Sequence, residues 1–278
     1  MTNWWSRRRF IESTSALAAL GLPAATVASP ATGQGATASV ASEGRAPDVW
    51  PQQDPAIVQE MVGVCHRDVA RVRELVEHQP ALANAAIDWG FGDWEDALGA
   101  ASHVGRREIA EVLLAHGARP SIFSAAMLGQ IDVVRALVGA SPGVQRTYGP
   151  HGITLMAHAR AGGSDAAAVV QYLETLGDAD QRRTTASLDA GDRDAVVGRY
   201  AFGAGPRDYL EVDVQNDRLG ITRSGATRHF LHHTGDLTFF PSGVPSVTIA
   251  FARAGGRVTQ LTVADPGRHV TARKSETP

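Results

Sequence analysis

The chain has 278 residues, of which 44% are hydrophobic and 20% are charged, a composition typical of globular rather than disordered or fibrous proteins. Its 26 basic and 29 acidic residues give a formal net charge of −3, which offers no electrostatic reason to expect a nucleic acid or an anionic membrane as partner. The single cysteine, Cys65, excludes an intramolecular disulfide and a thiolate metal cluster.

The N-terminal segment has the pattern of an export signal. This segment, residues 1–28, begins with a cluster of three arginines, continues with an Ala- and Leu-rich run and ends in small residues. Arg7 and Arg8, followed by Phe10, resemble the twin-arginine signal. This resemblance implies export of the folded protein to the periplasm or the medium, with no membrane attachment after cleavage. An uncleaved anchor is the alternative, but the apolar run is short and interrupted by Gly and Pro.

Two polar stretches divide the rest of the chain. Residues 29–55 consist mostly of small and polar residues, which cannot bury enough apolar surface to offset the entropy lost on ordering, so we expect a disordered linker. Residues 179–194 are rich in Asp, Arg and Thr and are interpreted as a second linker. The two linkers delimit an expected helical domain at residues 56–178 and a β domain at residues 195–275.

The stretch at residues 98–141 contains two copies of one pattern. When Gly105 is aligned with Gly129, small and apolar positions coincide, as Ala101 does with Ala125. Each copy consists of a short helix with a small-residue face, a glycine turn and a second apolar helix, which is the unit of a helical solenoid. Weaker copies precede and follow this pair, so the sequence predicts about four units.

This unit resembles the ankyrin repeat. The last copy opens with Thr154, Leu155 and Met156, where the family has Thr-Pro-Leu, and proline there only pre-sets the first helical turn. The turn positions at residues 67, 105, 129 and 163 are 38, 24 and 34 residues apart, against about 33 in ankyrin repeats. The middle junction therefore lacks about the length of a β-turn finger. The resemblance implies a solenoid that recognises another protein through its groove and fingers.

Two fingers are the candidate contact points. The first, at residues 88–94, carries Trp89, Phe91 and Trp94, and aromatic side chains in a Gly-rich loop have the properties of interface anchors. The alternative is that these tryptophans fold back onto the neighbouring helices. The second finger, around Gly149 and Pro150, presents two further candidates for binding. These are Tyr148 and His151.

The remaining histidines of the helical domain suggest no site. For His151 a catalytic role is conceivable, but no carboxylate or thiol with triad-like spacing accompanies it, so we assign no catalytic residue. His103 and His116 are expected to be exposed or to cap helices, and His158 is expected to be structural. Cys65 and the next residue, His66, do not share a helix face, which argues against a catalytic pair.

Beyond residue 194 the hydrophobic period changes to two. The alternation and the Gly- and Asn-containing turns predict eight short antiparallel strands, and hence a small barrel or curled sandwich. The expected strands are residues 196–202, 209–214, 218–223, 227–232, 237–240, 246–251, 258–263 and 269–273. The fold class is therefore multidomain α plus β, with an ankyrin-type solenoid of about four repeats followed by this β domain.

The β domain opens with Gly198-Arg199-Tyr200 and resembles, weakly, the accessory β-barrel that follows serine-hydrolase or penicillin-binding-like domains. That resemblance implies no chemistry of its own, because no Ser-x-x-Lys module precedes the barrel. Its interior is a candidate site for a small apolar ligand, although small barrels are usually filled by side chains. The expected lining is Phe202, Phe230, Phe239, Phe240 and Phe251.

A histidine cluster in this domain is the one metal-like motif. His229 and His233 share a strand face while His232 points the other way, so a three-histidine site would need a bulge. We expect no metal and no cofactor. The function predicted from the sequence is a non-enzymatic, exported interaction module of the bacterial cell envelope that binds a protein and no nucleic acid. A binder of small apolar ligands is the first alternative and a His-dependent hydrolase the second.

Overall fold

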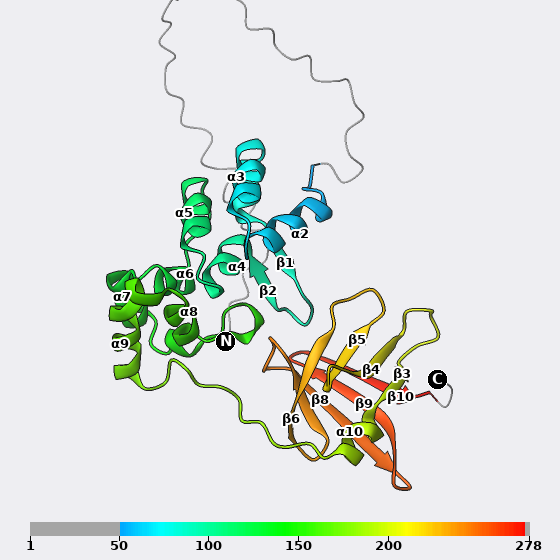
Figure 1. The fold of residues 1–278 in the computed structure, drawn as a ribbon. Helices are drawn as coiled ribbons and strands as arrows, with labels where there is room; N and C mark the ends of the chain where they lie inside the picture. The colour runs from blue at the N-terminus through cyan, green and yellow to red at the C-terminus, as the bar shows by residue number, and fades with distance from the viewer. Residues whose placement is uncertain (1–50, 276–278) are drawn as a thin grey trace, which may run out of the picture. The chain divides into compact units, whose positions relative to one another are not determined.

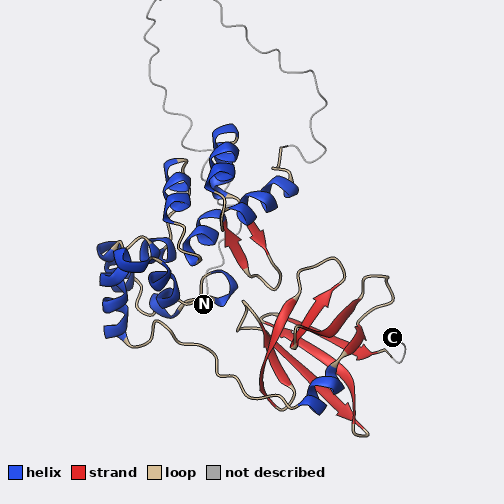
Figure 2. Cartoon of the chain, viewed as in Figure 1, coloured by secondary structure: helices blue, strands red, loops and turns tan. Residues whose placement is uncertain are grey.

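The computed structural model describes residues 51–275, which form a helical region followed by a β-barrel (Figures 1 and 2). The predicted signal, with Arg7 and Arg8, and most of the predicted linker at residues 29–55 lie outside these residues. The expected combination of a helical part and a β part is confirmed at this level. None of the helices in the described range is both long and apolar enough to traverse a lipid bilayer.

The helical region contains four pairs of α-helices. The first helix of each pair packs against the first helix of the next, and α3 packs against α5 as α7 does against α9. The pairs are α2 (Pro55–Val64) with α3 (Val69–His78), α4 (Ala97–His103) with α5 (Arg107–Ala115), α6 (Ile122–Met127) with α7 (Ile131–Ala140), and α8 (Leu155–Ala161) with α9 (Ala167–Leu176). Short 3-10 helices join them: η2 (Pro80–Asn84), η3 (Val144–Arg146), η4 (Pro150–Gly152) and η5 (Gly163–Ala166).

Glycine is required at the turns of the two central pairs. Gly105 and Gly129 have φ values of +72° and +74°, a left-handed conformation that disfavours other residues. A Cβ at either position would lie 2.2 Å from a backbone oxygen, that of Ala161 for Gly105 and that of Asp165 for Gly129. The two glycines that align in the sequence therefore meet the same requirement in the structure: a left-handed backbone close to a neighbouring carbonyl oxygen.

The first finger forms a β-hairpin before α4. Strand β1 (Ala86–Asp88) pairs antiparallel with β2 (Trp94–Asp96), and the turn between them includes Phe91 in a left-handed conformation. The second finger is an irregular loop closed by a bridge between Tyr148 and Thr154. As the short spacing indicates, residues 116–121, between α5 and α6, contain no strand.

The C-terminal region is a closed barrel, so the sandwich alternative is excluded. Its eight antiparallel strands follow one another in chain order, and the last pairs with the first. They are β3 (Gly198–Ala201), β4 (Tyr209–Gln215), β5 (Arg218–Arg223), β6 (His229–Gly235), β7 (Thr238–Pro241), β8 (Thr248–Ala254), β9 (Arg257–Asp265) and β10 (Arg268–Lys274). The predicted linker ends inside helix α10 (Ala190–Val196), which Asp189 caps.

The barrel is filled by side chains, and two predicted lining residues lie outside its core. Phe239 and Phe251 are buried in the core cluster, and Phe202 packs against it. Phe230 is not part of that cluster: its ring lies 3.5 Å from the guanidinium carbon of Arg218, because alternation along β6 turns it away from the interior. Phe240 is likewise outside the core cluster and stacks on His232. For Phe230 and Phe240 the expected lining role was wrong.

Candidate metal centre

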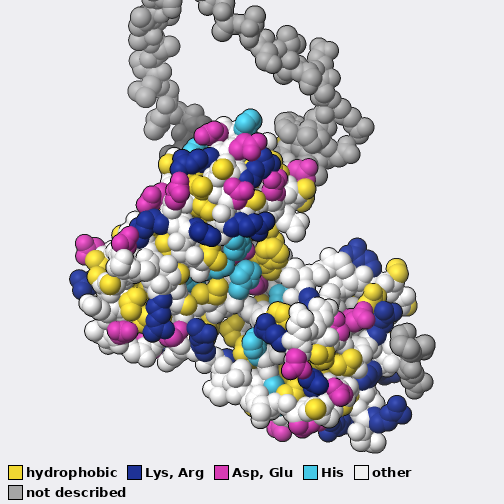
Figure 3. All heavy atoms as spheres, in the orientation of Figure 1, with side chains coloured by type: hydrophobic (Ala, Val, Ile, Leu, Met, Phe, Trp, Pro, Cys, Tyr) yellow, Lys and Arg dark blue, Asp and Glu magenta, His cyan; other side chains and the backbone are white. Residues whose placement is uncertain are grey.

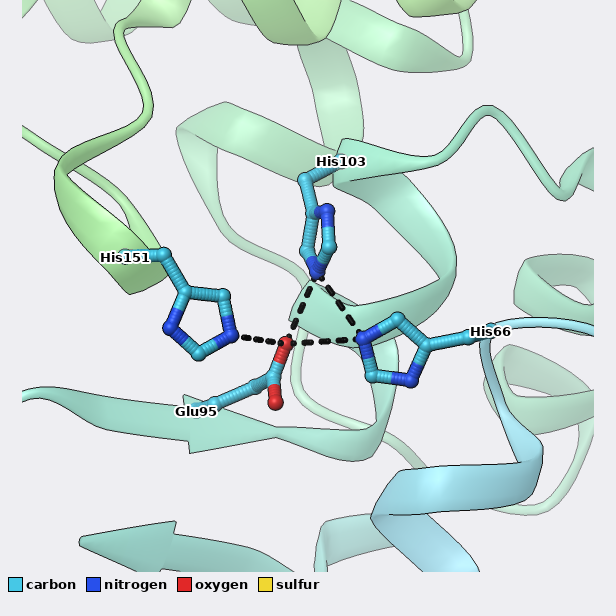
Figure 4. A group of neighbouring side chains, drawn as sticks. All are labelled: His66, Glu95, His103 and His151. Atoms are coloured by element: carbon cyan, nitrogen blue, oxygen red, sulfur yellow. Dashed lines mark hydrogen bonds and ion pairs between the residues drawn. The ribbon is translucent and has the colours of Figure 1, made fainter. Parts of the chain in front are cut away.

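Three histidines and a glutamate converge within the helical region (Figure 4). His66 lies in the turn after α2, Glu95 in the centre of β2, His103 at the end of α4 and His151 in η4. Each side chain offers one ligand atom, and these atoms lie within 4.8 Å of one another. Four separate elements, drawn from three helix pairs and the hairpin, thus bring nitrogen and oxygen lone pairs to one point.

The distances between these atoms match the spacing around a small metal ion. Glu95 Oε1 lies 2.8 Å from His103 Nε2, 3.3 Å from His66 Nε2 and 3.3 Å from His151 Nε2. The Nε2 atoms of His66 and His103 are 3.1 Å apart. A tetrahedral ion with bonds of about 2.0–2.1 Å would place its ligands about 3.3 Å from one another. These four distances lie within about 0.5 Å of that spacing, and all four ligand atoms lie within 4.8 Å of one another.

Hydrogen bonds behind two of the histidines fix which nitrogen faces the centre. His66 Nδ1 donates to the carbonyl oxygens of Val62 and Gly63, at 3.1 and 3.2 Å. His151 Nδ1 donates to Asp93 Oδ2 at 3.0 Å, and its backbone N–H donates to Asp93 Oδ1 at 2.8 Å. Since carbonyl and carboxylate oxygens only accept, each Nδ1 carries the proton and each Nε2 turns toward Glu95. Such outer partners are typical of metal-ligating histidines.

The glutamate is held in the same way. Trp89 Nε1 donates to Glu95 Oε2 at 2.9 Å, which leaves Oε1 for the centre. Side chains alternate along β2 and the residue before it, so Asp93 and Glu95 are both buried, while Trp94 between them points outward and is 62% exposed. The pattern Asp-Trp-Glu thus supplies one ligand from β2 and one outer partner from the residue that precedes this strand.

The electrostatics favour a cation at this point. Burial alone would raise the pKa of Glu95, but the hydrogen bonds from His103, His151 and His66 outweigh it, and this pKa lies well below its ordinary value. The hydrogen bond to Asp93, and then that to Glu95, raises the pKa of His151 to about 10, and Glu95 also raises that of His66. The buried carboxylate of Glu95 is therefore ionised, and the raised pKa values of His151 and His66 favour protons on these two histidines. A divalent ion would displace those protons.

A cavity of about 450 Å³ borders the centre on one side. His66, Glu95 and His151 line it, together with Arg67 from the helical region and Ser242 from the barrel. His103 does not line it.

The predicted binding residues have different environments. Trp89 is half-buried and holds Glu95, whereas Phe91 packs against the barrel core. Trp94 and Tyr148 line a cavity of about 900 Å³, and Tyr148 Oη donates to the carbonyl oxygen of Gln181. A further cavity of about 400 Å³ lies at the barrel end, where Phe91, Phe202, Leu210, Ile221, Val263 and Val270 form its apolar lining.

The histidines of the barrel do not form a comparable group. His229 and His233 each direct Nδ1 to a backbone carbonyl, those of Ser242 and Ser187, and His232 stacks on Phe240. In residues 51–275 they belong to no cluster that could hold a metal ion.

Sequence reasoning missed His66, Glu95 and His103. The expectation that His103 is exposed or a simple cap was wrong, because its side chain is only 9% exposed and lies 2.8 Å from Glu95. One signal was available: His66 and His103 stand one and two residues before the turn positions 67 and 105 of successive helix pairs, and stacking of the pairs brings these neighbouring positions close together. Burial raises the pKa of Cys65 to about 12, so this thiol stays protonated beside the site.

Three imidazoles and a carboxylate are groups that can bind a metal ion, and their geometry is the observation from which a function can be inferred. No protein-family model matches the chain, and no curated protein matches its sequence.

Proposed function

We propose that the protein binds one divalent transition-metal ion of the zinc class. The ligands are the Nε2 atoms of His66, His103 and His151 and the Oε1 atom of Glu95. The observation that carries the proposal is the convergence of these four atoms, with the second polar atoms of His66, His151 and Glu95 held by neighbouring groups. Imidazole and carboxylate ligands suit zinc, iron, nickel and copper, whereas a calcium or magnesium site is built from oxygens.

The ion also has a structural consequence. Its ligands come from the turn after α2, the hairpin, α4 and the loop before α8, so one bound ion links three helix pairs. Because the unfolded chain cannot present these groups together, binding stabilises the folded state. The gain is about 2.7 kcal/mol at a free-metal concentration of 100 times Kd.

Metal content and calorimetry test this function. The chain from residue 29 onward, stripped with a chelator, is titrated with zinc, and we expect one equivalent to bind. Glu95→Gln and His103→Gln should lose it. His116→Gln is the matched control, because His116 directly follows the end of α5, much as His103 ends α4, but its Nδ1 donates to the carbonyl of Val112. Absence of stoichiometric binding by the wild-type chain, or equal binding by Glu95→Gln, would refute the proposal.

Protein recognition by an exported ankyrin-type array is the second candidate function. Two observations favour it: consecutive helix pairs pack side by side, and Trp94, at 62% exposure, stands beside Tyr148 at a large cavity. The twin-arginine resemblance of the N-terminal segment supports a location in the periplasm or outside the cell.

Capture of partners from envelope extracts tests this second function. We expect the Trp94→Ala variant to lose a partner that the wild-type chain retains. Trp89→Ala is not a clean probe of binding, because it also removes the hydrogen bond to Glu95. If Trp94→Ala captures the same proteins in the same amounts, the first finger is not the recognition element.

A further inference from the structure

The metal centre is open on one side. Glu95 and His103 have side-chain exposures of 0% and 9%, whereas those of His66 and His151 are 27% and 36%. Figure 3 shows histidine side chains reaching the surface of the helical region. The three ligands that line the 450 Å³ cavity leave His103 as the closing group behind them. The coordination sphere is therefore asymmetric, with its accessible side toward the cavity.

A zinc-class ion is most often four-coordinate, but its coordination can expand to five ligands. Structural zinc sites are closed on all sides, while sites that exchange ligands keep a position accessible. Here three ligands face the same cavity, so that position points into a space large enough for several atoms beyond water.

The charges around the cavity select the class of ligand. Glu95 and Asp93 together balance the charge of a divalent ion. Arg67 also lines the cavity, and within residues 51–275 its side chain forms no ion pair. Arg228, the other arginine of the wall, donates from Nε and Nη2 to Asp213 at 2.8 and 3.2 Å, and within residues 51–275 its buried Nη1 has no hydrogen-bond partner. The cavity thus combines a Lewis acid with the guanidinium of Arg67, which forms no ion pair inside the described residues 51–275 and can bind an anion.

We propose that the ion keeps an exchangeable position facing this cavity and binds there a small molecule carrying an anionic oxygen, a carboxylate or a phosphate, with Arg67 as the second anchor. This inference rests on the proposed metal function. Water occupies the position when the anion is absent. The site then recognises a small oxyanion, unlike a structural metal site, whose coordination sphere is closed.

Cobalt spectroscopy tests the inference independently of any activity. The chain from residue 29 onward is loaded with Co²⁺ in place of zinc, and its visible bands are recorded during titration with azide, acetate and inorganic phosphate. We expect saturable changes, with the bands weakening as the ion becomes five-coordinate. The titrations with acetate and with phosphate show whether the site prefers a carboxylate or a phosphate. The titration with azide, a small anion, tests whether the ion has an accessible coordination position.

Two surface variants test the role of the arginine. Arg67→Gln should weaken the preferred oxyanion about tenfold while leaving azide binding less affected. Arg119→Gln changes another exposed arginine, one that does not line the cavity, and this variant should bind as the wild-type chain does.

The outcomes separate the two proposals. A chain that takes up Co²⁺ but whose spectrum no anion changes has a sealed site, which overturns this inference and leaves metal binding intact. Equal oxyanion affinity in Arg67→Gln and wild type overturns the role of the arginine. A chain that takes up no Co²⁺ overturns the metal function itself.

Discussion

The helical region and the barrel bury different kinds of side chain. In the barrel the buried residues are almost all apolar, with His229 as the exception. In the helical region the buried set includes Asp93, Glu95 and His158, along with several neutral polar residues. Because burying a charge is costly unless it is paired, a fold keeps such groups where they serve a purpose. The contrast places both buried acidic residues in the helical region, where the proposed metal site lies, and leaves the barrel with a mainly apolar interior.

The largest expected effect comes from removing the central carboxylate. Glu95→Ala leaves three histidines and the Trp89 N–H without their common partner, and we expect a loss of about 3–5 kcal/mol in the free energy of unfolding without metal. His229→Ala, at the barrel's buried polar residue, removes a ring whose two nitrogens lie 3.1 and 3.0 Å from the carbonyl oxygens of Ser242 and Trp89, to one of which a neutral imidazole donates, and should cost about 1–3 kcal/mol. Urea denaturation of both variants measures the difference. A larger loss for His229→Ala would contradict the comparison.

The stability of the helical region should also depend on pH. Burial lowers the pKa of His158 to about 4, while an unfolded histidine has a pKa of about 6.5. The unfolded chain therefore takes up this proton first, and stability is lost as the pH falls from about 6.5 toward 4. The loss amounts to about 3 kcal/mol at the low end of this range. In His158→Gln the free energy of unfolding, measured by urea denaturation at pH 7 and 4.5, should fall less than in wild type. Identical slopes would show that His158 is not buried in the neutral form.

Smaller effects should separate backbone strain from steric contact. In Gly105→Ala a Cβ would lie 2.2 Å from the Ala161 carbonyl oxygen, whereas at Gly117, also left-handed, no atom lies within 4 Å. We expect Gly117→Ala to cost about 1 kcal/mol from strain alone, and Gly105→Ala to cost about 1–3 kcal/mol more. Thermal unfolding of the two variants gives the difference. Equal losses would mean that the helix pairs do not pack as closely as described.

The barrel could be predicted closely from the sequence because its signals are local. Alternation along each strand and the turn at Asn216 and Asp217, both left-handed, fix the strands and their connections. Gly105 and Gly129 likewise indicate a repeated turn through the pattern of residues around them. These features depend on neighbours a few residues apart, which a sequence pattern reports directly.

The metal centre could not be predicted in this way. His103 is 37 residues from His66 and 48 from His151, and each alone resembles an ordinary surface or capping residue. Their convergence depends on how far the helix pairs advance per repeat and on how the hairpin folds back, which spacing does not specify. Trp89 shows the same limit: its predicted role was partner binding, whereas in the structure its indole N–H holds the metal-facing carboxylate.

X-ray absorption at the zinc edge tests the central claim most directly. With one equivalent of zinc bound to the chain from residue 29 onward, we expect three imidazole nitrogens and one oxygen at about 2.0–2.1 Å, with outer-shell scattering from the imidazole rings. A fifth, light-atom ligand fits the open position. Two results would contradict the assignment of His66, Glu95, His103 and His151. One is a shell made of oxygens alone. The other is a sulfur ligand at about 2.3 Å, for which Cys65 is the one thiol within residues 51–275.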